Sequence, residues 1–292
     1  MPVVAVSEPV AAAGSIQFLV FGDWGTGDPD QRKVAQAMIR RVEATPRGRI
    51  DFILTTGDNF YYSGVNSIHD RQWSDKFEDV YTDPVFQVPF FPTLGNHDHE
   101  GNIAAQIQYS QVSPRWRMPA RYYTFTRSFG NGISAQFFAL DTAALETRDR
   151  DAEQTTWLSR ELASSQATWK IVYGHFPLYS HSIRPLNTRL IERLEPILVE
   201  HGVDLYMAGH DHTMQMLGPV KGVNHLVTGG GAGPGFAYDV RWEDDTAHAA
   251  TGGGFVLVRA GSSELTIEFV GMSGQPEYTH VLESKARSGS RR

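Results

Sequence analysis

The sequence predicts an α/β fold, and three observations lead to this class. Short apolar runs rich in β-branched and aromatic residues recur along the 292-residue chain, and runs that are apolar throughout are typical of strands covered on both faces. Several segments between these runs have the periodicity of amphipathic helices. Five of the runs end in a glycine that is followed by a polar residue, which indicates that the backbone turns sharply at the strand ends.

Five strands are therefore expected, each ending just before one of these glycines. Their expected ranges are 18–21, 52–54, 90–94, 171–173 and 205–207. The C-terminal part of the chain then changes to a β pattern without intervening helices. Residues 255–258 and 265–270 are rich in strand-forming residues and are separated by Gly and Ser, so they predict hairpins that complete a sheet.

Three helices are expected between the strands. The first follows Asp30 over residues 31–43 and places apolar side chains on one face, as an amphipathic helix requires. The second begins after Asp151, which is expected to cap it, with Glu153 in its first turn. The third spans residues 186–201. We expect one domain over residues 16–283, with residues 1–15 as a leader or an artificial end and residues 284–292 as a flexible tail.

The composition limits the classes of partner. The net charge is -7 and no Lys- or Arg-rich block precedes the last residues, so we expect neither a nucleic-acid scaffold nor a membrane as partner. No apolar stretch approaches the ~20 residues that cross a bilayer. The absence of cysteine excludes a thiolate metal site. We expect a monomer, secreted or periplasmic with its signal removed.

Polar residues follow the five strand-terminating glycines. These residues are Asp23, Asp58, Asn96, His175 and His210. Because ligands in open α/β sheets bind just past the carboxyl ends of the strands, we expect these side chains to meet at one rim. Carboxylate, amide and imidazole donors together suit a pair of metal ions ~3.5–4 Å apart, which can clamp the oxygens of a phosphoryl group during its transfer. His212 adds an imidazole one residue beyond Asp211, on the same side of an extended backbone as His210.

Taken in order, these motifs resemble the metallophosphoesterase superfamily, and within it the purple acid phosphatases, most of all the small single-domain tartrate-resistant acid phosphatases. The motifs are GDWG (22–25), GDNFYYSG (57–64), GNHDH (95–99), GHFPLYS (174–180) and GHDH (209–212). The resemblance covers residues 16–282 without a large gap. It implies a four-layer αββα sandwich of two mixed sheets flanked by helices.

The resemblance implies an acid phosphatase that hydrolyses phosphate monoesters with a hydroxide activated by two metals, without a covalent phosphoenzyme. A phosphodiesterase or nucleotide hydrolase on the same centre is the alternative within enzymes. A non-catalytic module that binds phosphate or metal is the alternative outside them. The expected cofactors are Fe(III) and a divalent ion, which is Fe, Zn or Mn.

A departure at residue 25 makes the metal assignment specific. Many metallophosphoesterases begin with Asp-x-His, but this chain has Gly25 where that histidine stands. The purple branch fills the vacancy with a tyrosine three residues after the bridging aspartate, and Tyr61 occupies that position. The resemblance therefore implies two sets of ligands that share Asp58. The ferric set is Asp23, Tyr61 and His212, and the divalent set is Asn96, His175 and His210.

The resemblance also implies groups that face the substrate. His97 matches the histidine that holds phosphate or protonates the leaving alkoxide, and Asp98 could orient it. Relatives have a second histidine nine residues after the Gly-His ligand, where this chain has Arg184, with His181 three residues earlier. Either His181 serves as the acid, or Arg184 binds phosphate through its planar fork of donors and leaves protonation to His97.

Overall fold

The computed structural model describes residues 6–7, 14–130, 132–147, 152–233 and 239–285. Most of the expected leader at residues 1–15 and of the expected tail at residues 284–292 lies outside these ranges, as does the predicted cap Asp151.

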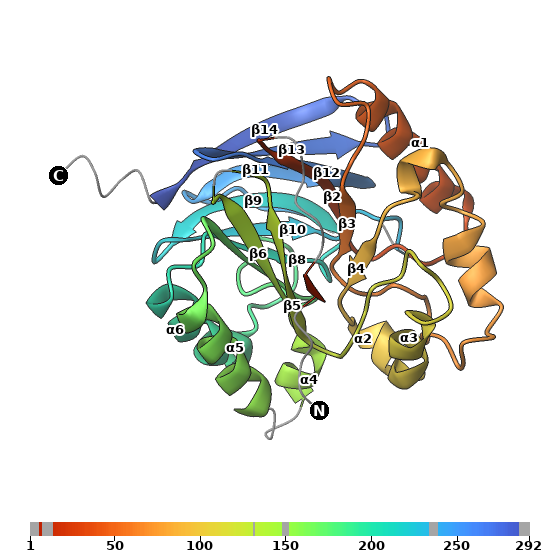
Figure 1. The fold of residues 1–292 in the computed structure, drawn as a ribbon, viewed down its shortest axis with the longest axis horizontal. Coiled ribbons are helices and arrows are strands. Elements are labelled where there is room, and N and C mark those ends of the chain that lie inside the picture. Colours follow the sequence, from red (N-terminus) through yellow and green to blue (C-terminus); the bar gives the residue numbers. More distant parts are fainter. Residues whose placement is uncertain (1–5, 8–13, 131, 148–151, 234–238, 286–292) are drawn as a thin grey trace.

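Two mixed sheets form the centre of the molecule (Figure 1). The six-stranded sheet has the order β14-β13-β12-β2-β3-β4, and its strands are β2 (Ile16–Phe21), β3 (Phe52–Thr55), β4 (Phe90–Pro92), β12 (Gly254–Ala260), β13 (Glu264–Gly271) and β14 (Pro276–Glu283). The eight-stranded sheet has the order β1-β5-β6-β7-β8-β10-β9-β11. Its strands are β1 (Val6–Ser7), β5 (Tyr123–Ser128), β6 (Ser134–Ala139), β7 (Trp169–Tyr173), β8 (Leu205–Ala208), β9 (Thr213–Val220), β10 (Val223–Thr228) and β11 (Thr246–Thr251).

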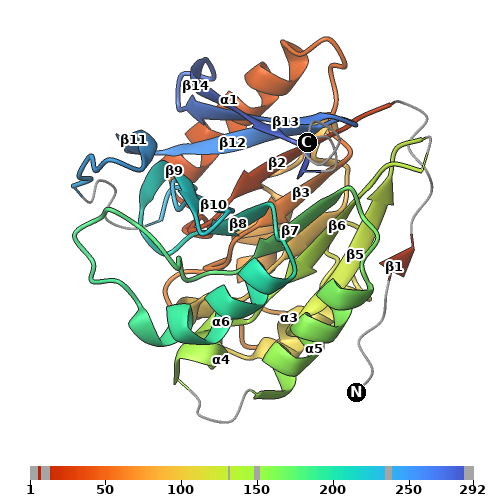
Figure 2. The same ribbon diagram turned by 90° about the vertical axis from the view of Figure 1, so that its left-hand side faces the viewer.

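Helices cover the outer faces of both sheets (Figure 2). The α-helices of the described ranges are α1 (Pro29–Glu43), α2 (Asn96–His99), α3 (Ile103–Tyr109), α4 (Thr142–Thr147), α5 (Ala152–Ser164) and α6 (Thr188–Glu200). A short π-helix (Ser74–Glu78) and a 3-10 helix (Pro84–Phe86) lie between β3 and β4. Helix α1 packs on β12 and β13, and α5 and α6 pack on β6, β7 and β8. The expected four-layer arrangement is therefore confirmed.

The core between the sheets is built from aromatic rings. Phe18 of β2 stacks on Phe52 of β3, with ring centroids 4.7 Å apart. Phe137 of β6, in the opposite sheet, meets both rings edge-on, at 5.4 Å from Phe18 and 5.3 Å from Phe52. All three side chains are fully buried. Aromatic pairs add stabilisation beyond their buried area. This cluster therefore fixes the position of one sheet relative to the other, and with it the positions of the loops that follow the strands.

The start of α1 differs from the prediction. Asp28, rather than Asp30, caps the helix, and its carboxylate accepts hydrogen bonds from the backbone amides of Asp30 and Gln31, both at 3.0 Å. Pro29 occupies the first helical position, where a missing N–H costs nothing. The helix therefore begins two residues before the predicted range of 31–43.

The expected single rim also needs correction. Strands β2, β3 and β4 belong to one sheet, whereas β7 and β8 belong to the other. The polar residues that follow these strands therefore come from two sheets whose ends lie together. Strands β1, β5, β6, β9, β10, β11 and β14 were not predicted. Most of them have alternating or short patterns without a run that is apolar throughout, whereas the apolar run at residues 137–140 that ends β6 was missed.

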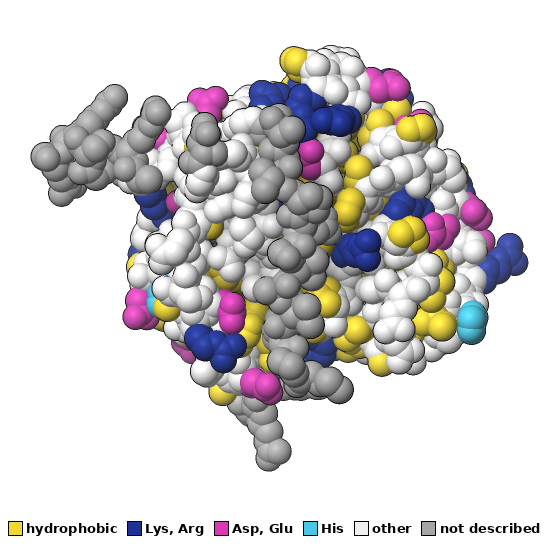
Figure 3. Space-filling model, in the orientation of Figure 1, with side chains coloured by type: hydrophobic (Ala, Val, Ile, Leu, Met, Phe, Trp, Pro, Cys, Tyr) yellow, Lys and Arg dark blue, Asp and Glu magenta, His cyan; other side chains and the backbone are white. Residues whose placement is uncertain are grey.

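Charged side chains on the face drawn in Figure 3 are interspersed, with acidic groups between separate groups of Lys and Arg. No helix of the described ranges is long and apolar enough to span a bilayer.

Phe137→Ala should lower the free energy of unfolding by about 3–5 kcal/mol, because it removes the ring that joins the two sheets and leaves a cavity. Urea denaturation at a fixed metal concentration measures the change. Val281→Ala is the control, since Val281 is 50% exposed and its truncation should cost no more than about 0.5 kcal/mol. Equal effects of the two variants would contradict the packing described here.

Candidate metal centre

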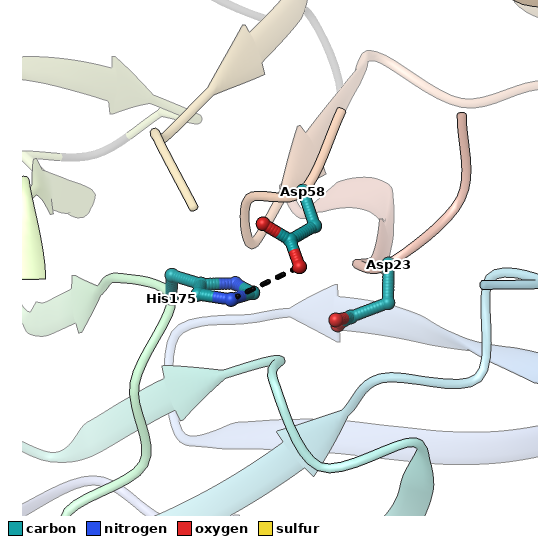
Figure 4. A group of neighbouring side chains, drawn as sticks. All are labelled: Asp23, Asp58 and His175. Carbon is teal, nitrogen blue, oxygen red and sulfur yellow. Dashed lines mark ion pairs between the residues drawn. The ribbon is translucent and has the colours of Figure 1, made fainter. Parts of the chain in front are cut away.

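The predicted donor residues converge where the two sheets end. Asp23, Asp58 and Asn96 follow β2, β3 and β4 of the six-stranded sheet, while His175 follows β7 and His210 and His212 follow β8 of the eight-stranded sheet. Tyr61 lies in the loop after β3. Figure 4 shows Asp23, Asp58 and His175 pointing toward a shared space, and each of these three offers a ligand atom within 4.8 Å of the others.

Backbone amides orient the two carboxylates. The Asp23 Oδ2 atom accepts a hydrogen bond from the backbone N–H of His210 at 2.8 Å. The Asp58 Oδ1 atom accepts one from the backbone N–H of His97 at 2.9 Å. Because one oxygen of each carboxylate is held in this way, the other oxygen, Asp23 Oδ1 or Asp58 Oδ2, faces the centre of the cluster.

The Tyr61 hydroxyl lies among three groups that can accept hydrogen bonds. It is 3.1 Å from Asp23 Oδ1, 3.1 Å from Asp58 Oδ2 and 3.1 Å from His212 Nε2. A phenol has one hydrogen to donate. If His212 Nε2 also carries a hydrogen, it can donate to the Tyr61 oxygen, and the phenol can donate to one carboxylate. The contact with the other carboxylate oxygen then has no hydrogen between the two oxygen atoms. Since buried acceptors need a compensating positive group, this geometry suits a cation.

A second group of donors adjoins the first. Asn96 Oδ1 is 3.0 Å from His175 Nε2 and 3.2 Å from His210 Nδ1, and these two nitrogens are 3.3 Å apart. His175 Nδ1 is 2.9 Å from the backbone oxygen of Thr56, so Nδ1 bears the hydrogen and Nε2 of the neutral ring presents a lone pair. Imidazole and amide donors suit divalent ions of the first transition row.

Asp58 connects the two groups. Its Oδ2 atom is 3.1 Å from the Tyr61 hydroxyl and 3.4 Å from His175 Nε2. From this position between both sets of donors, Asp58 would be able to contact an ion in each set. Burial would raise the pKa of the Asp58 carboxyl, but the His175 and His97 imidazoles hold it well below its usual range, which keeps this carboxylate ionised.

The titratable groups show how much positive charge the cluster needs. Burial raises the pKa of the Tyr61 phenol well above its usual value, and the Asp23 and Asp58 carboxylates raise it further. Burial lowers the pKa of His175, but the Asp58 carboxylate outweighs this and raises the pKa to about 9. Burial and the charge of His175 lower the pKa of His210 to about 2. In the absence of a cation, a proton on His175 therefore offsets part of the negative charge of the two carboxylates.

The donors are held in uncommon backbone conformations. Among the described residues, five non-glycine residues have positive φ, and three of them are Asp23 at 58°, Asp58 at 49° and His210 at 66°. Such conformations cost of order 1–3 kcal/mol each and persist only where the surroundings enforce them. The turn at each strand end redirects the side chain away from the strand and into the cluster.

Two glycines leave space that the cluster requires. A Cβ on Gly25 would lie 1.8 Å from the backbone oxygen of Asn59, so this backbone excludes a histidine at position 25. A Cβ on Gly233 would lie 2.9 Å from both the Tyr61 hydroxyl and His212 Cε1. Gly233 therefore packs directly on two of the predicted donors.

His97 and Asp98 have different surroundings. His97 Nε2 is 4.0 Å from Asp58 Oδ2, and its ring packs on Tyr61 with centroids 4.7 Å apart. The His97 Nδ1 atom bonds to the backbone oxygen of Tyr62. The buried Asp98 carboxylate instead accepts hydrogen bonds from Asn59, Gly95 and Gln106. Asp98 thus braces the loop after β3 against the start of α2. The Tyr62 carbonyl, rather than Asp98 as predicted, contacts the His97 ring and can orient it.

His181 and Arg184, the two alternatives for the second substrate-facing group, have different surroundings. The His181 ring turns to Asp245, with Nε2 2.6 Å from Oδ1. Arg184 lies beside the donors, because its Nε atom is 3.4 Å from Oδ1 of Asp211, the residue between His210 and His212. Arg184 also lines a cavity of about 350 Å³ with His210 and Asp211 in its wall. The geometry therefore favours Arg184.

Two supporting residues were not found from the sequence. The Thr142 hydroxyl accepts hydrogen bonds from the backbone amides of His175 and Phe176, both at 2.9 Å. The Asp211 carboxylate accepts one from the Ser182 hydroxyl at 2.6 Å. The Asp-Thr pair at 141–142 and the serines on either side of His181 were the available signals, but their partners lie too far along the chain to be paired by inspection.

Known proteins have sequences similar to that of this chain. Residues 16–214 match the family model described as calcineurin-like phosphoesterase. Tartrate-resistant acid phosphatase type 5 of Homo sapiens is 32% identical over 305 residues, which cover 94% of this chain and 93% of the human protein. Purple acid phosphatase 4 of Arabidopsis thaliana is 35% identical, over 89% of this chain and 81% of the plant protein. These matches span the loops that bear the predicted donors.

Solved structures share the fold. A Plasmodium protein described as GAP50, the anchor in the inner membrane complex, superposes with a TM-score of 0.83 at 26% identity, over 93% of this chain and 89% of that protein. Purple acid phosphatase PPD1 from yellow lupin (Lupinus luteus) seeds superposes with a TM-score of 0.74 at 19% identity, over 96% of this chain and 56% of the lupin chain. The lupin likeness concerns the fold alone.

Zn²⁺ binding to the metal-free protein at pH 7.5 should release about one proton or more per chain. His175 holds a proton up to a pKa of about 9 and must lose it from Nε2 to bind a cation. Apparent affinity should therefore rise with pH and level off above about pH 9. Calorimetric titration in buffers with different ionisation enthalpies counts the protons. An affinity that is constant from pH 6 to pH 9 would contradict this charge balance.

Proposed function

Because the chain belongs to the calcineurin-like phosphoesterase family, in its purple acid phosphatase branch, we propose that its clustered donors hold two metal ions for the hydrolysis of phosphate monoesters. Acid phosphatase activity is the function that its relatives support. We also propose an identity for each of the two ions and a role for each donor.

Two sets of donors share Asp58 in this proposal. One ion is held by Asp23, Tyr61 and His212, and the other by Asn96, His175 and His210. We propose Fe(III) for the first, because Tyr61 lies beside two carboxylates that oppose its ionisation, and a highly charged ion is needed to hold its phenolate. Imidazole and amide donors favour Fe, Zn or Mn as a divalent ion for the second site.

When bound, two cations neutralise the phosphate oxygens and lower the pKa of a water molecule that attacks phosphorus in line, so no phosphoenzyme is required. His97 directs Nε2 toward this region while the Tyr62 carbonyl holds its other nitrogen. It can therefore donate a proton to the leaving oxygen. Arg184 offers charge-assisted hydrogen bonds to the phosphoryl oxygens. Asp98 fixes the loop and the helix that position Asp58 and His97.

One observation supports the proposal most strongly. The Tyr61 hydroxyl and two carboxylate oxygens meet at 3.1 Å in a buried site that lacks enough hydrogens to join them. A non-catalytic module needs fewer groups. Such a module does not require a proton donor or an additional phosphate-binding cation. His97 provides a partly exposed imidazole beside the donors, and Arg184 provides a guanidinium.

Metal removal should abolish hydrolysis of phenyl phosphate, and metal readdition should restore it. For the metal-loaded protein, kcat/KM for phenyl phosphate should exceed that for diphenyl phosphate, because a monoester has the additional ionised oxygen that two cations and Arg184 can bind. A higher kcat/KM for the diester would indicate a phosphodiesterase instead. Metal binding without turnover of either ester would indicate a binding module.

Arg184→Met should raise the KM for phenyl phosphate and the inhibition constant of inorganic phosphate by roughly tenfold or more, since it removes charge-assisted hydrogen bonds to the phosphoryl group. His181→Gln is the matched comparison from the same loop, and both constants should change by less than about threefold because its ring faces Asp245. Steady-state kinetics measure both. A large effect of His181→Gln with a small effect of Arg184→Met would reverse the assignment.

Monomeric assembly and export from the cytoplasm stay predictions. Light scattering of the purified protein tests the first, and fractionation of the producing cells tests the second.

A further inference from the structure

We propose that the cavity beside the metal centre is a leaving-group pocket, and that it selects phosphate monoesters whose leaving alcohol carries an uncharged ring. The inference rests on the proposed hydrolysis of monoesters. It adds a specificity site and a class of substrate to that function.

The position of the cavity gives the first argument. It has a volume of about 350 Å³ and lies between the segment that follows His175, the segment that leads into α6, and the turn at residues 210–211. His210 is thus common to the metal centre and to the cavity wall. A monoester with its phosphoryl group at the centre can extend its leaving group into this space. The volume is at the small end of the roughly 300–1,000 Å³ found for ligand pockets, so it suits one compact group and not a polymer.

The lining gives the second argument. Apolar side chains line two of the three parts of the cavity, the segment after His175 and the segment that leads into α6: Phe176, Pro177, Leu178, Pro185 and Leu186. Phe176 is held against the His210 ring with centroids 4.2 Å apart, so it forms a fixed aromatic surface next to the centre. Leu186 is 49% exposed, which places an accessible apolar side chain in the wall. An apolar ring would bury these surfaces on binding.

Charge balance gives the third argument. Two arginines line the cavity, Arg184 and Arg189, and two carboxylates line it as well, Glu146 and Asp211. Arg184 pairs with Asp211, and the Glu146 carboxylate accepts a hydrogen bond from Asn187 at 3.1 Å. With Arg184 engaged by the phosphoryl group at the centre, the lining keeps one arginine and two carboxylates. A leaving group with its own phosphate would therefore meet no excess of positive charge there, whereas a neutral ring would lose little.

The test compares two alkyl phosphates whose leaving alcohols have similar intrinsic reactivity, 2-phenylethyl phosphate and ethyl phosphate. For the metal-loaded wild type, kcat/KM should be roughly tenfold or more higher for the ring-bearing ester, as burial of a phenyl group predicts. Leu186→Trp should fill part of the cavity and reduce this ratio toward one, and Leu186→Ala should reduce it less. Ile183→Trp is the matched control, because Ile183 is 63% exposed in the same loop but does not line the cavity; it should keep the wild-type ratio.

Binding of phosphonates separates this proposal from the hydrolytic function. Calorimetry should find that 2-phenylethylphosphonate binds the metal-loaded protein more tightly than ethylphosphonate, and that Leu186→Trp removes the difference. This result would support the pocket even if neither ester were hydrolysed, which would refute the monoesterase function alone. Equal kcat/KM values for the two esters, with equal affinities for the two phosphonates, would refute the pocket and leave the hydrolytic function intact. A ratio that Ile183→Trp lowers as much as Leu186→Trp would also refute it.

Discussion

The cluster around Asp58 is the constraint on which the rest of the site depends. Two carboxylates, a phenol, an amide oxygen and three imidazoles are brought together in a largely buried space. These groups repel one another or lack hydrogens to share, so the cluster is stable only with added positive charge. The fold supplies rigidity for it, because the aromatic core holds two sheets together and strained turns aim side chains inward. Metal binding is the natural source of the missing charge.

Much of the site could be predicted because five of the seven donors follow a recognisable local pattern, whereas Tyr61 was assigned from the family resemblance. A buried strand, a glycine and a polar residue in succession identify Asp23, Asp58 and His175 without knowledge of the tertiary structure. Features that depend on distant partners could not be predicted. The Asp98 carboxylate reaches back to Asn59, and His181 turns to Asp245, which is 64 residues away. Similarly, the division of the strands between two sheets depends on pairings such as β12 with β2, which hydrophobic periodicity does not specify.

The substrate side of the site is where this chain departs from the family pattern expected from its motifs. Arg184 occupies the position at which the resemblance implies a histidine, and its guanidinium pairs with Asp211, which lies between the predicted donors His210 and His212. A guanidinium binds phosphate oxygens but cannot donate a proton at neutral pH. In the proposed reaction, proton donation to the leaving group is therefore left to His97, which would divide the two roles between separate loops. The same loop that bears Arg184 forms one wall of the adjoining cavity.

The metal content and visible spectrum of freshly purified protein test the central claim most directly. The account predicts two metal ions per chain, one of them iron, and a visible tyrosinate band that Tyr61→Phe removes, since Tyr61 is the phenol within the cluster. A colourless, iron-free enzyme that is active with Zn or Mn would refute the ferric assignment alone. Protein that binds a single ion, or whose metal content is unchanged in Asp58→Ala, would contradict the shared two-metal centre.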